Sequence, residues 1–178
     1  MIFHKTKLKD AYEIELNKLG DERGFFARAF CQNEFAEHGL NTIFKQCNLS
    51  RSADKYTLRG FHFQTDGAEE AKLIRCTKGS ILDIIIDIRP SSPSYMEHIS
   101  IELTSQNHKM LYVPEGFAHS FITLEEDTEV FYMVSEFYTP GKEQGIRWND
   151  PSFDIEWPTD SPVISEKDAN WPDYIRKK

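Results

Sequence analysis

Seven polar side chains lie in stretches of the sequence that are otherwise apolar or aromatic. They are Arg59, His62, Gln64, Lys72, Asp83, His119 and Tyr132. His62 lies between Phe61 and Phe63 in the stretch LRGFHFQ, where a strand core would favour valine. An imidazole can take up and release a proton near neutral pH, and neighbouring cations and a tyrosine could hold an anion and return the proton. Together these residues suggest acid–base chemistry in a closed pocket.

Each of these residues also has a purely structural explanation. Arg59 and Lys72 could be solvated strand residues or pair with surface carboxylates, as most charged side chains do. Asp83, which interrupts the run ILDIIID, could form a salt bridge. Tyr132 could be a core residue whose hydroxyl bonds the backbone. Only the combination of these residues favours a functional site over a set of unrelated structural contacts.

The elements that must position these residues are mainly β-strands. In the first of three predicted strands, Ile99, Ile101 and Leu103 alternate with polar residues, which is typical of a half-buried strand. The three stretches are HISIELTS (98–105), HKMLYVP (108–114) and EVFYMVSEFY (129–138).

A turn between two apolar runs predicts how two further strands pair. The runs AKLIRC (71–76) and SILDIIIDIR (80–89) flank the turn TKG, which predicts a β-hairpin. Strands at regular spacing, joined by turns, predict an all-β antiparallel sandwich or barrel.

Short helical segments are predicted near both ends of the chain. QNEFAEHG (32–39) predicts one helix, with Asn33 as its N-cap and Gly39 at its end. SPVISEKDANWPDY (161–174) predicts a short helix or turn packed against the strands. Because no linker, repeat or low-complexity tract interrupts the sequence, residues 1–178 are expected to form a single domain.

Composition limits the classes of partner. The 178 residues include 13 phenylalanines and 7 tyrosines, which suits a β-rich fold. The net charge of −8 argues against non-specific binding to nucleic acid or a membrane, so an anionic ligand would have to be met by local cations.

The start MIFHKTKLKD lacks the apolar run of a signal peptide. Three unpaired-looking cysteines, Cys31, Cys47 and Cys76, predict a reduced, cytoplasmic location.

Two motifs resemble those of the cupin superfamily. PEGFAHSF (114–121) resembles the second cupin motif, and GFHFQ followed by Glu69 or Glu70 and then Gly79 loosely resembles the first. The first motif usually supplies two histidines for a metal, but here the second histidine position is Gln64. Glutamine is a poor substitute for imidazole at a transition-metal site. The resemblance therefore implies a cupin barrel without a metal, in which His62 is free for acid–base work.

A more specific resemblance covers nearly the whole chain. Five stretches, in order, are similar to motifs of the dTDP-4-dehydrorhamnose 3,5-epimerase family. They are DERGFF (21–26), LRGFHFQ (58–64), PEGFAHSF (114–121), WNDPSFDIEWP (148–158) and SEKD (165–168). This resemblance implies a jelly-roll cupin subunit, a homodimer, no metal or other cofactor, and a nucleotide-linked 4-keto-6-deoxy sugar as substrate.

The resemblance also implies a role for each catalytic candidate. His62 corresponds to the base that takes a proton next to the C4 ketone, Tyr132 to the acid on the opposite face, and Lys72 with Arg59 to the cations that stabilise the enolate. Asp168 corresponds to the carboxylate that pairs with the base. From the residues alone, Asp168 could equally belong to a capping box, because Ser165-x-x-Asp168 has that spacing.

Further positions match the family's substrate-binding residues. Arg23 is expected to hold the diphosphate and Tyr138 to stack on the nucleobase. The remaining matches are Gln46, Asn48, His119, Glu143 and Lys167. Glu143 could also be a solvated loop residue.

The chain departs from the family pattern on the nucleotide side. The family's glutamate after GFF is Arg28, Cys47 lies between Gln46 and Asn48, and Met133 follows Tyr132. If residue 28 touches the base edge, an arginine, which only donates hydrogen bonds, would favour cytosine over thymine. A CDP-linked sugar therefore stays open as the substrate.

Several alternative functions stay open at this stage. One is an epimerase that inverts C3 or C5 only, because the same base and acid serve both carbons. Others are a 3,4-ketoisomerase, a metal-dependent cupin oxygenase and a non-catalytic binder of nucleotide sugars. A binder would tolerate the loss of His62, Lys72 and Tyr132, and all three are present.

Overall fold

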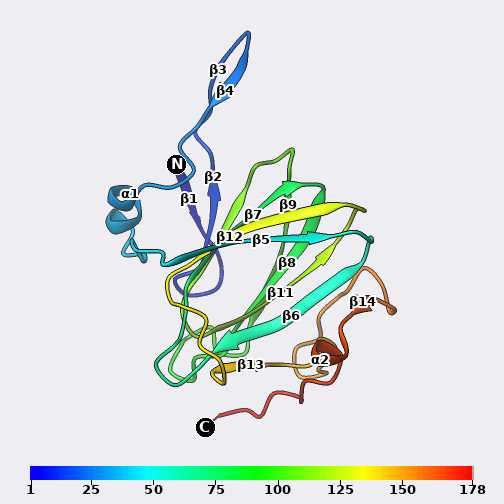
Figure 1. The fold of residues 1–178 in the computed structure, drawn as a ribbon. Coiled ribbons are helices and arrows are strands. Elements are labelled where there is room, and N and C mark those ends of the chain that lie inside the picture. Colours follow the sequence, from blue (N-terminus) through cyan, green and yellow to red (C-terminus); the bar gives the residue numbers. More distant parts are fainter. Residues whose placement is uncertain (178) are drawn as a thin grey trace.

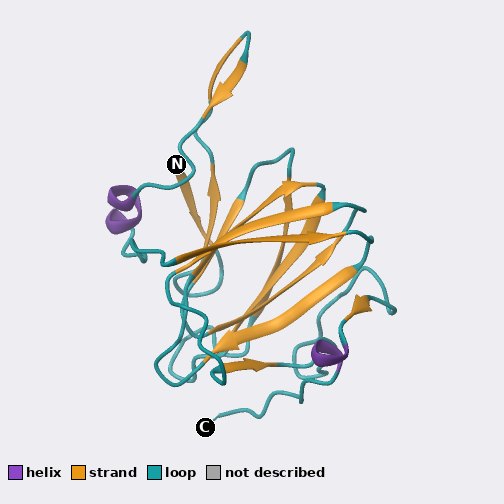
Figure 2. Cartoon of the chain, viewed as in Figure 1, coloured by secondary structure: helices purple, strands orange, loops and turns teal. Residues whose placement is uncertain are grey.

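The computed structural model describes residues 1–177, which form two β-sheets that face each other (Figures 1 and 2). The first sheet has the order β1 (Ile2–Lys5), β2 (Tyr12–Glu15), β10 (Met110–Val113), β7 (Lys72–Lys78), β12 (Thr128–Val134) and β5 (Gln46–Ser52). The second has the order β13 (Glu143–Gly145), β6 (Thr57–Gln64), β11 (Phe117–Thr123), β8 (Ser80–Asp87) and β9 (His98–Thr104). A short strand, β14 (Val163–Ile164), pairs with β6 in parallel. This architecture confirms the predicted all-β sandwich.

The predicted hairpin between β7 and β8 is wrong. β7 pairs with β10 and β12 in the first sheet, whereas β8 pairs with β9 and β11 in the second. The turn at Gly79 therefore carries the chain from one sheet to the other. Gly79 has a φ of +74°, and a Cβ there would lie 2.4 Å from the Thr128 hydroxyl, so both conformation and space require glycine. A sheet-to-sheet corner and a hairpin share the same local pattern of two apolar runs around a turn.

The β8 strand is buried on both faces, which explains its nearly continuous apolar sequence. Ile81 and Ile85 point into the core between the sheets. Ile84 and Ile86 pack on the opposite side against the C-terminal part of the chain, which covers the outer face of the second sheet. By alternation, Asp83 and Asp87 share the inner face with Ile81 and Ile85.

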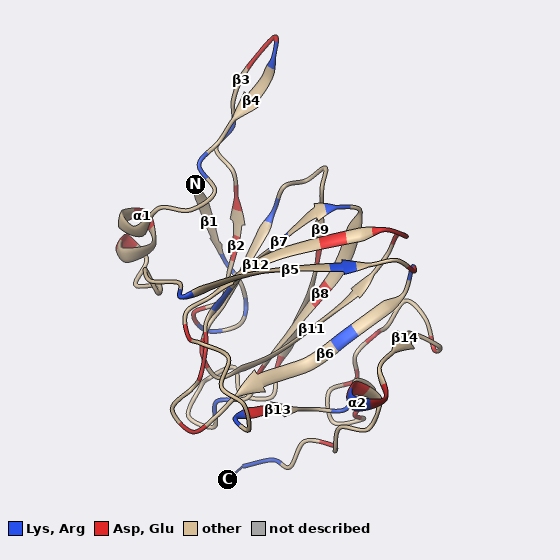
Figure 3. Cartoon of the chain, viewed as in Figure 1, with Lys and Arg blue, Asp and Glu red and all other residues tan. Residues whose placement is uncertain are grey.

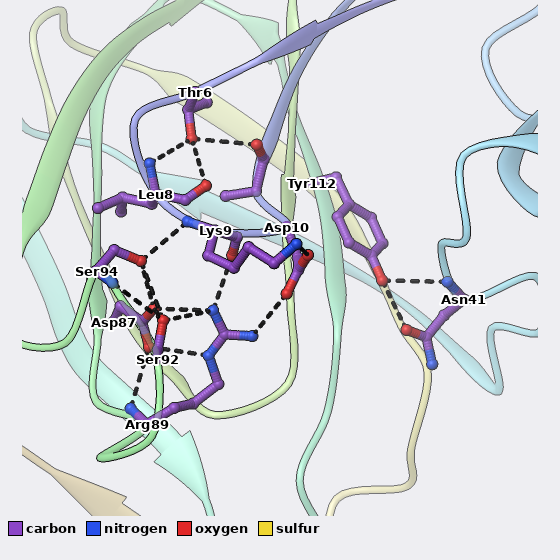
Figure 4. Close-up of polar contacts among 11 residues, drawn as sticks. Thr6, Leu8, Lys9, Asp10, Asn41, Asp87, Arg89, Ser92, Ser94 and Tyr112 are labelled. Carbon is purple, nitrogen blue, oxygen red and sulfur yellow. Dashed lines mark hydrogen bonds and ion pairs between the residues drawn. The ribbon is translucent and has the colours of Figure 1, made fainter.

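Asp87 has a structural role at the end of β8. Its fully buried carboxylate accepts hydrogen bonds from the Arg89 guanidinium at 2.8–2.9 Å and from the hydroxyls of Ser92 and Ser94 (Figure 4). Burial alone would raise the pKa of Asp87, but these donors outweigh it and lower the pKa. Arg89 also binds Asp10 in the loop between β1 and β2, so the cluster ties the two sheets together.

The helix α1 (Gln32–Glu37) begins two residues earlier than a cap at Asn33 would allow. Its N-cap is Cys31, which makes no side-chain capping bond, so the prediction of Asn33 as cap is wrong. Burial of Phe35 against the first sheet holds this short helix in place. The predicted end at Gly39 is confirmed, because the N–H of Gly39 binds the carbonyl of Ala36 and its φ is +70°.

Two segments lie at the margins of the sandwich. A hairpin of β3 (Leu19–Asp21) and β4 (Gly24–Phe26) projects away from both sheets (Figure 1) and exposes Leu19, Phe25 and Phe26. The helix α2 (Glu166–Ala169) packs beside β6. Within residues 1–177, no helix is both long and apolar enough to cross a membrane.

Candidate active site

A polar pocket of two adjoining hollows lies between the sheets, with volumes of about 220 and 210 Å³. His62, Lys72 and Tyr132 line both hollows, so the two form one site. The first is also lined by the predicted residues Gln46, Asn48, Tyr138 and Glu143, and the second by Arg59, His119 and Asp168. Figure 3 shows acidic and basic residues interspersed along the chain, and Lys72 and Arg59 bring positive charge to the lining of the pocket.

A β-bulge in β6 brings Arg59 and His62 to the same wall. His62 pairs with His119, and Arg59 pairs with Phe121, so β6 has one extra residue over this interval. Gly60 lies in the bulge with a φ of +119°, and a Cβ there would lie 2.6 Å from the His119 carbonyl oxygen. Only glycine fits, and the bulge overrides the strand alternation that would place the two side chains on opposite faces.

His62 forms a close pair with Asp168. Its Nε2 lies 2.7 Å from Asp168 Oδ1, and the other oxygen of the carboxylate accepts the Gly60 N–H. Burial would raise the pKa of Asp168, but the hydrogen bond and charge of His62, the Gly60 N–H and the Trp171 indole together lower it. With Nε2 donating to an ionised carboxylate, Nδ1 of His62 is the nitrogen left to accept a proton, and it has no hydrogen-bond partner among the described residues.

The geometry shows the Asp168 carboxylate paired with His62, whereas only half of the predicted capping box is formed. The backbone N–H of Asp168 donates to the Ser165 side chain at 3.1 Å, so Ser165 caps α2 as its spacing predicts. The Asp168 carboxylate turns to His62 instead of back to the cap. The helix cap thus fixes the backbone that carries the carboxylate into the site.

Tyr132 and Lys72 line the pocket from the first sheet. Burial, followed by the charge of Glu70, raises the pKa of Tyr132 above its ordinary value despite the opposing charge of Arg59. The hydroxyl is therefore protonated at neutral pH and can donate a proton. The ammonium of Lys72 lies 2.7 Å from Glu70, and both side chains are largely buried, so the lysine is held in one place in the pocket.

Asp83 belongs to the polar set of the sequence but was assigned no role, and in the structure it forms a second histidine–aspartate pair. Both of its oxygens lie 3.0 Å from Nε2 of His119. The carboxylate is fully buried, and His119 is its only hydrogen-bond partner among residues 1–177. A buried carboxylate needs such a donor, so the pair fixes the orientation of His119 at the pocket wall. The sequence signal that could have revealed this pair is Asp83 itself, an acidic residue within the apolar run ILDIIID.

Gln64 has a structural role. Its side-chain nitrogen donates to the carbonyls of Ala68 and Phe137 and to Glu70, and its oxygen accepts the Thr139 N–H at 2.7 Å. Across the described residues, no group of three or more histidine, cysteine or acidic side chains is placed to hold a metal ion.

We expect activity to survive exhaustive chelation. The reason is that Gln64 replaces a histidine ligand and is fully engaged by protein groups. Turnover measured before and after dialysis against EDTA checks this expectation. Loss of activity that returns with Fe²⁺, Mn²⁺ or Zn²⁺ would contradict it.

Three predicted site residues lie outside the pocket of their own chain. Arg23 is at the tip of the projecting hairpin, where its 83% exposed side chain pairs with Asp21. Arg28 is 62% exposed and pairs with Glu34 at 3.2 Å. Lys167 pairs with Glu143 at the pocket edge. The chain alone therefore brings together the catalytic candidates but not the two arginines expected on the nucleotide side.

Comparisons with known proteins identify the family of the chain. The sequence profile of the dTDP-4-dehydrorhamnose 3,5-epimerase family matches residues 5–175. A dTDP-4-dehydrorhamnose 3,5-epimerase of Shigella flexneri is 40% identical over 172 residues, covering 96% of this chain and 94% of that protein.

Two solved structures are also similar. One is the dTDP-4-dehydrorhamnose 3,5-epimerase of Bacillus anthracis with TDP and PPi bound, with a TM-score of 0.94 and 38% identity over 97% of this chain and 99% of that chain. The other is the dTDP-6-deoxy-D-glucose-3,5-epimerase of Legionella pneumophila in complex with dTDP-4-keto-L-rhamnose, with a TM-score of 0.90 and 33% identity over 97% and 92% of the two chains. By sequence along nearly its full length and by fold, the chain belongs to the dTDP-4-dehydrorhamnose 3,5-epimerase family, whose members are isomerases.

Proposed function

We propose that this protein epimerises a nucleoside-diphosphate 4-keto-6-deoxyhexose at C3, C5 or both, with dTDP-4-dehydro-6-deoxyglucose as the substrate. The observation that carries the proposal is the placement of the His62–Asp168 pair and Tyr132 around one pocket that also contains Lys72 and Arg59. The relative from Legionella pneumophila, which binds dTDP-4-keto-L-rhamnose, supports the class of ligand.

The chemistry requires two proton transfers and no redox step. The C4 ketone acidifies the protons on C3 and C5, so a base can remove one of them to leave an enolate. Nδ1 of His62 takes this proton while Asp168 holds the Nε2–H and stabilises the resulting imidazolium. Lys72 and Arg59 stabilise the enolate oxygen. Tyr132 then protonates the carbon from the opposite face, which inverts it.

The outer part of the pocket is suited to the nucleotide. Tyr138 is exposed at the pocket, where its ring can stack on a base. Gln46 and Asn48 are next to it on β5 and offer hydrogen bonds, while Glu143 and Lys167 pair at the edge. We expect His119, which Asp83 orients, to bind the sugar or diphosphate.

A homodimer would explain the positions of Arg23 and Arg28. The projecting hairpin cannot stabilise itself with exposed Phe25 and 71% exposed Phe26, so a second copy of the chain is the simplest cover. An apolar groove on the outer face of the first sheet, lined in part by Phe131 and Met133, offers a further apolar surface that a second copy of the chain could cover. In such a dimer the hairpin of one subunit could carry Arg23 to its partner's pocket. A monomeric mass by light scattering would refute this arrangement.

The direct test is turnover of purified dTDP-4-dehydro-6-deoxyglucose, with the product identified by its proton coupling constants. Inversion at both carbons supports a 3,5-epimerase, whereas inversion at one supports the single-carbon alternative. Isomerisation of the ketone to C3 would instead identify a 3,4-ketoisomerase.

The nucleotide preference can be tested at Arg28. We expect dTDP to bind at least as tightly as CDP, and Arg28→Glu to leave this order unchanged, because Glu34 already engages the guanidinium. Competition binding of dTDP, CDP, UDP and GDP to both proteins measures the order. CDP binding about tenfold tighter, with reversal in Arg28→Glu, would contradict this expectation and identify Arg28 as a reader of the base edge.

A further inference from the structure

Trp171 contacts the His62–Asp168 pair from outside the pocket. Its indole N–H donates to Asp168 Oδ1 at 3.3 Å, and this is the same oxygen that lies 2.7 Å from His62 Nε2. The indole ring also meets the His62 ring edge to face, with centroids 6.5 Å apart. Trp171 follows the SEKD stretch by three residues and was not among the predicted site residues.

The neighbouring strand is shaped to hold this indole. Gly145 pairs directly with His62 across β13 and β6, and a Cβ on Gly145 would lie 2.3–2.4 Å from indole atoms of Trp171. The φ of Gly145 is not positive, so the ring, and not the backbone conformation, requires glycine there. Beyond the ring, the Pro172 carbonyl accepts the Arg147 N–H at 3.0 Å, which fixes the segment that carries Trp171.

We propose that Trp171 is a positioning residue for the base, which holds the proton of the pair on His62 Nε2 and so keeps Nδ1 as the basic nitrogen. An indole N–H can only donate, so it favours the ionised carboxylate whatever the state of the histidine. Trp171 and His62 are both bound to Oδ1 and Gly60 is bound to Oδ2, so transfer of the Nε2 proton to the carboxylate would weaken the hydrogen bonds that Trp171 and Gly60 donate to it. The indole also draws negative charge from Oδ1, which tempers the basicity of the pair.

Other charged and titratable groups around the His62–Asp168 pair also influence its protonation. They are Arg59 on β6, Lys72 with Glu70, His119 with Asp83, Tyr132 on β12, Glu143 on β13 and Lys167 on α2. The ammonium of Lys167 lies over the indole of Trp171 at 5.5 Å from the ring centroid. Trp171→Phe leaves all of these residues in place and keeps an aromatic ring at position 171, while it removes the N–H that binds Asp168.

The test compares Trp171→Phe with Trp157→Phe. Both replacements keep an aromatic ring and delete one indole N–H, but the N–H of Trp157 donates to the Trp148 carbonyl instead of a carboxylate. In Trp171→Phe the carboxylate becomes more basic and stabilises the imidazolium. We expect the midpoint of the His62 titration, followed by its ¹⁵N signals in NMR, to move up by about half a pH unit. Loss of the signals in His62→Asn assigns them.

Two further measurements complete the test. Gly145→Ala, which displaces the indole while His62 and Asp168 stay unsubstituted, should move the midpoint in the same direction. Although the proposal rests on the proposed function, the NMR titration needs no substrate, so failure of the epimerase assay leaves this test intact. In turnover, the acid limb of kcat/KM should follow the same shift. If Trp171→Phe lowers Tm as Trp157→Phe does but leaves the midpoint within about 0.1 unit of the wild type, the indole is only structural and the proposal is overturned.

Discussion

Replacement of His62 by asparagine is expected to lower turnover by ~10²–10⁴-fold or more while leaving the fold and nucleotide binding intact, the scale at which a general base contributes. Asparagine can still contact Asp168 but cannot accept the proton from C3 or C5. The measurement is substrate-dependent incorporation of deuterium from heavy water, alongside binding of dTDP.

The matched control is His4→Asn, which removes an exposed histidine that faces Glu15 on the edge of the first sheet. That variant should exchange at the wild-type rate. Wild-type incorporation in His62→Asn would contradict the assignment of the base and would shift attention to the second pair, His119 and Asp83.

Replacement of Tyr132 by phenylalanine is expected to separate exchange from inversion. His62 can still remove and return a proton on its own face, so deuterium enters, but no hydroxyl protonates the opposite face. Net inversion should therefore fall much further than exchange at the same carbon. Because the pKa of Tyr132 is raised, this donor stays protonated above the ordinary range of a tyrosine, and the wild-type enzyme should keep its inversion activity into mildly alkaline solution.

Tyr112→Phe is the matched control for this experiment. Tyr112 is a buried tyrosine of the same sheet whose hydroxyl binds Asn41 at 2.6 Å, away from the pocket (Figure 4). Its loss should lower stability but leave the ratio of exchange to inversion unchanged. A strictly parallel fall of both rates in Tyr132→Phe would mean that Tyr132 orients the substrate without donating the proton.

Local patterns in the sequence predicted the elements that depend on local physics. The alternation of Ile99, Ile101 and Leu103 predicted a half-buried strand, which β9 confirms. Gly39 predicted the end of α1, and Ser165 predicted the cap of α2, because turn and cap geometry depend on adjacent residues. The resemblance to the family then supplied the site, since it marks residues that only the complete fold brings together.

What the sequence could not predict depends on contacts between distant residues. The crossing from β7 to β8 is set by which strands each one meets, and the turn at Gly79 carries no information about that choice. The bulge at Gly60 places Arg59 beside His62 against the strand period. Asp83 and Trp171 became site neighbours only when their partners were placed.

The central claim is that His62 and Tyr132, in one pocket, remove and return protons on the carbons next to the ketone of the substrate. The most direct measurement is the deuterium content of C3 and C5 after the wild-type protein and the His62→Asn variant act on dTDP-4-dehydro-6-deoxyglucose in heavy water, with a protein-free sample as the blank. The proposed mechanism predicts solvent deuterium at C3, C5 or both in the wild type, and none above the blank in the variant. Tight binding of the substrate with no deuterium at either carbon would contradict the mechanism and would identify the protein as a non-catalytic binder of nucleotide sugars.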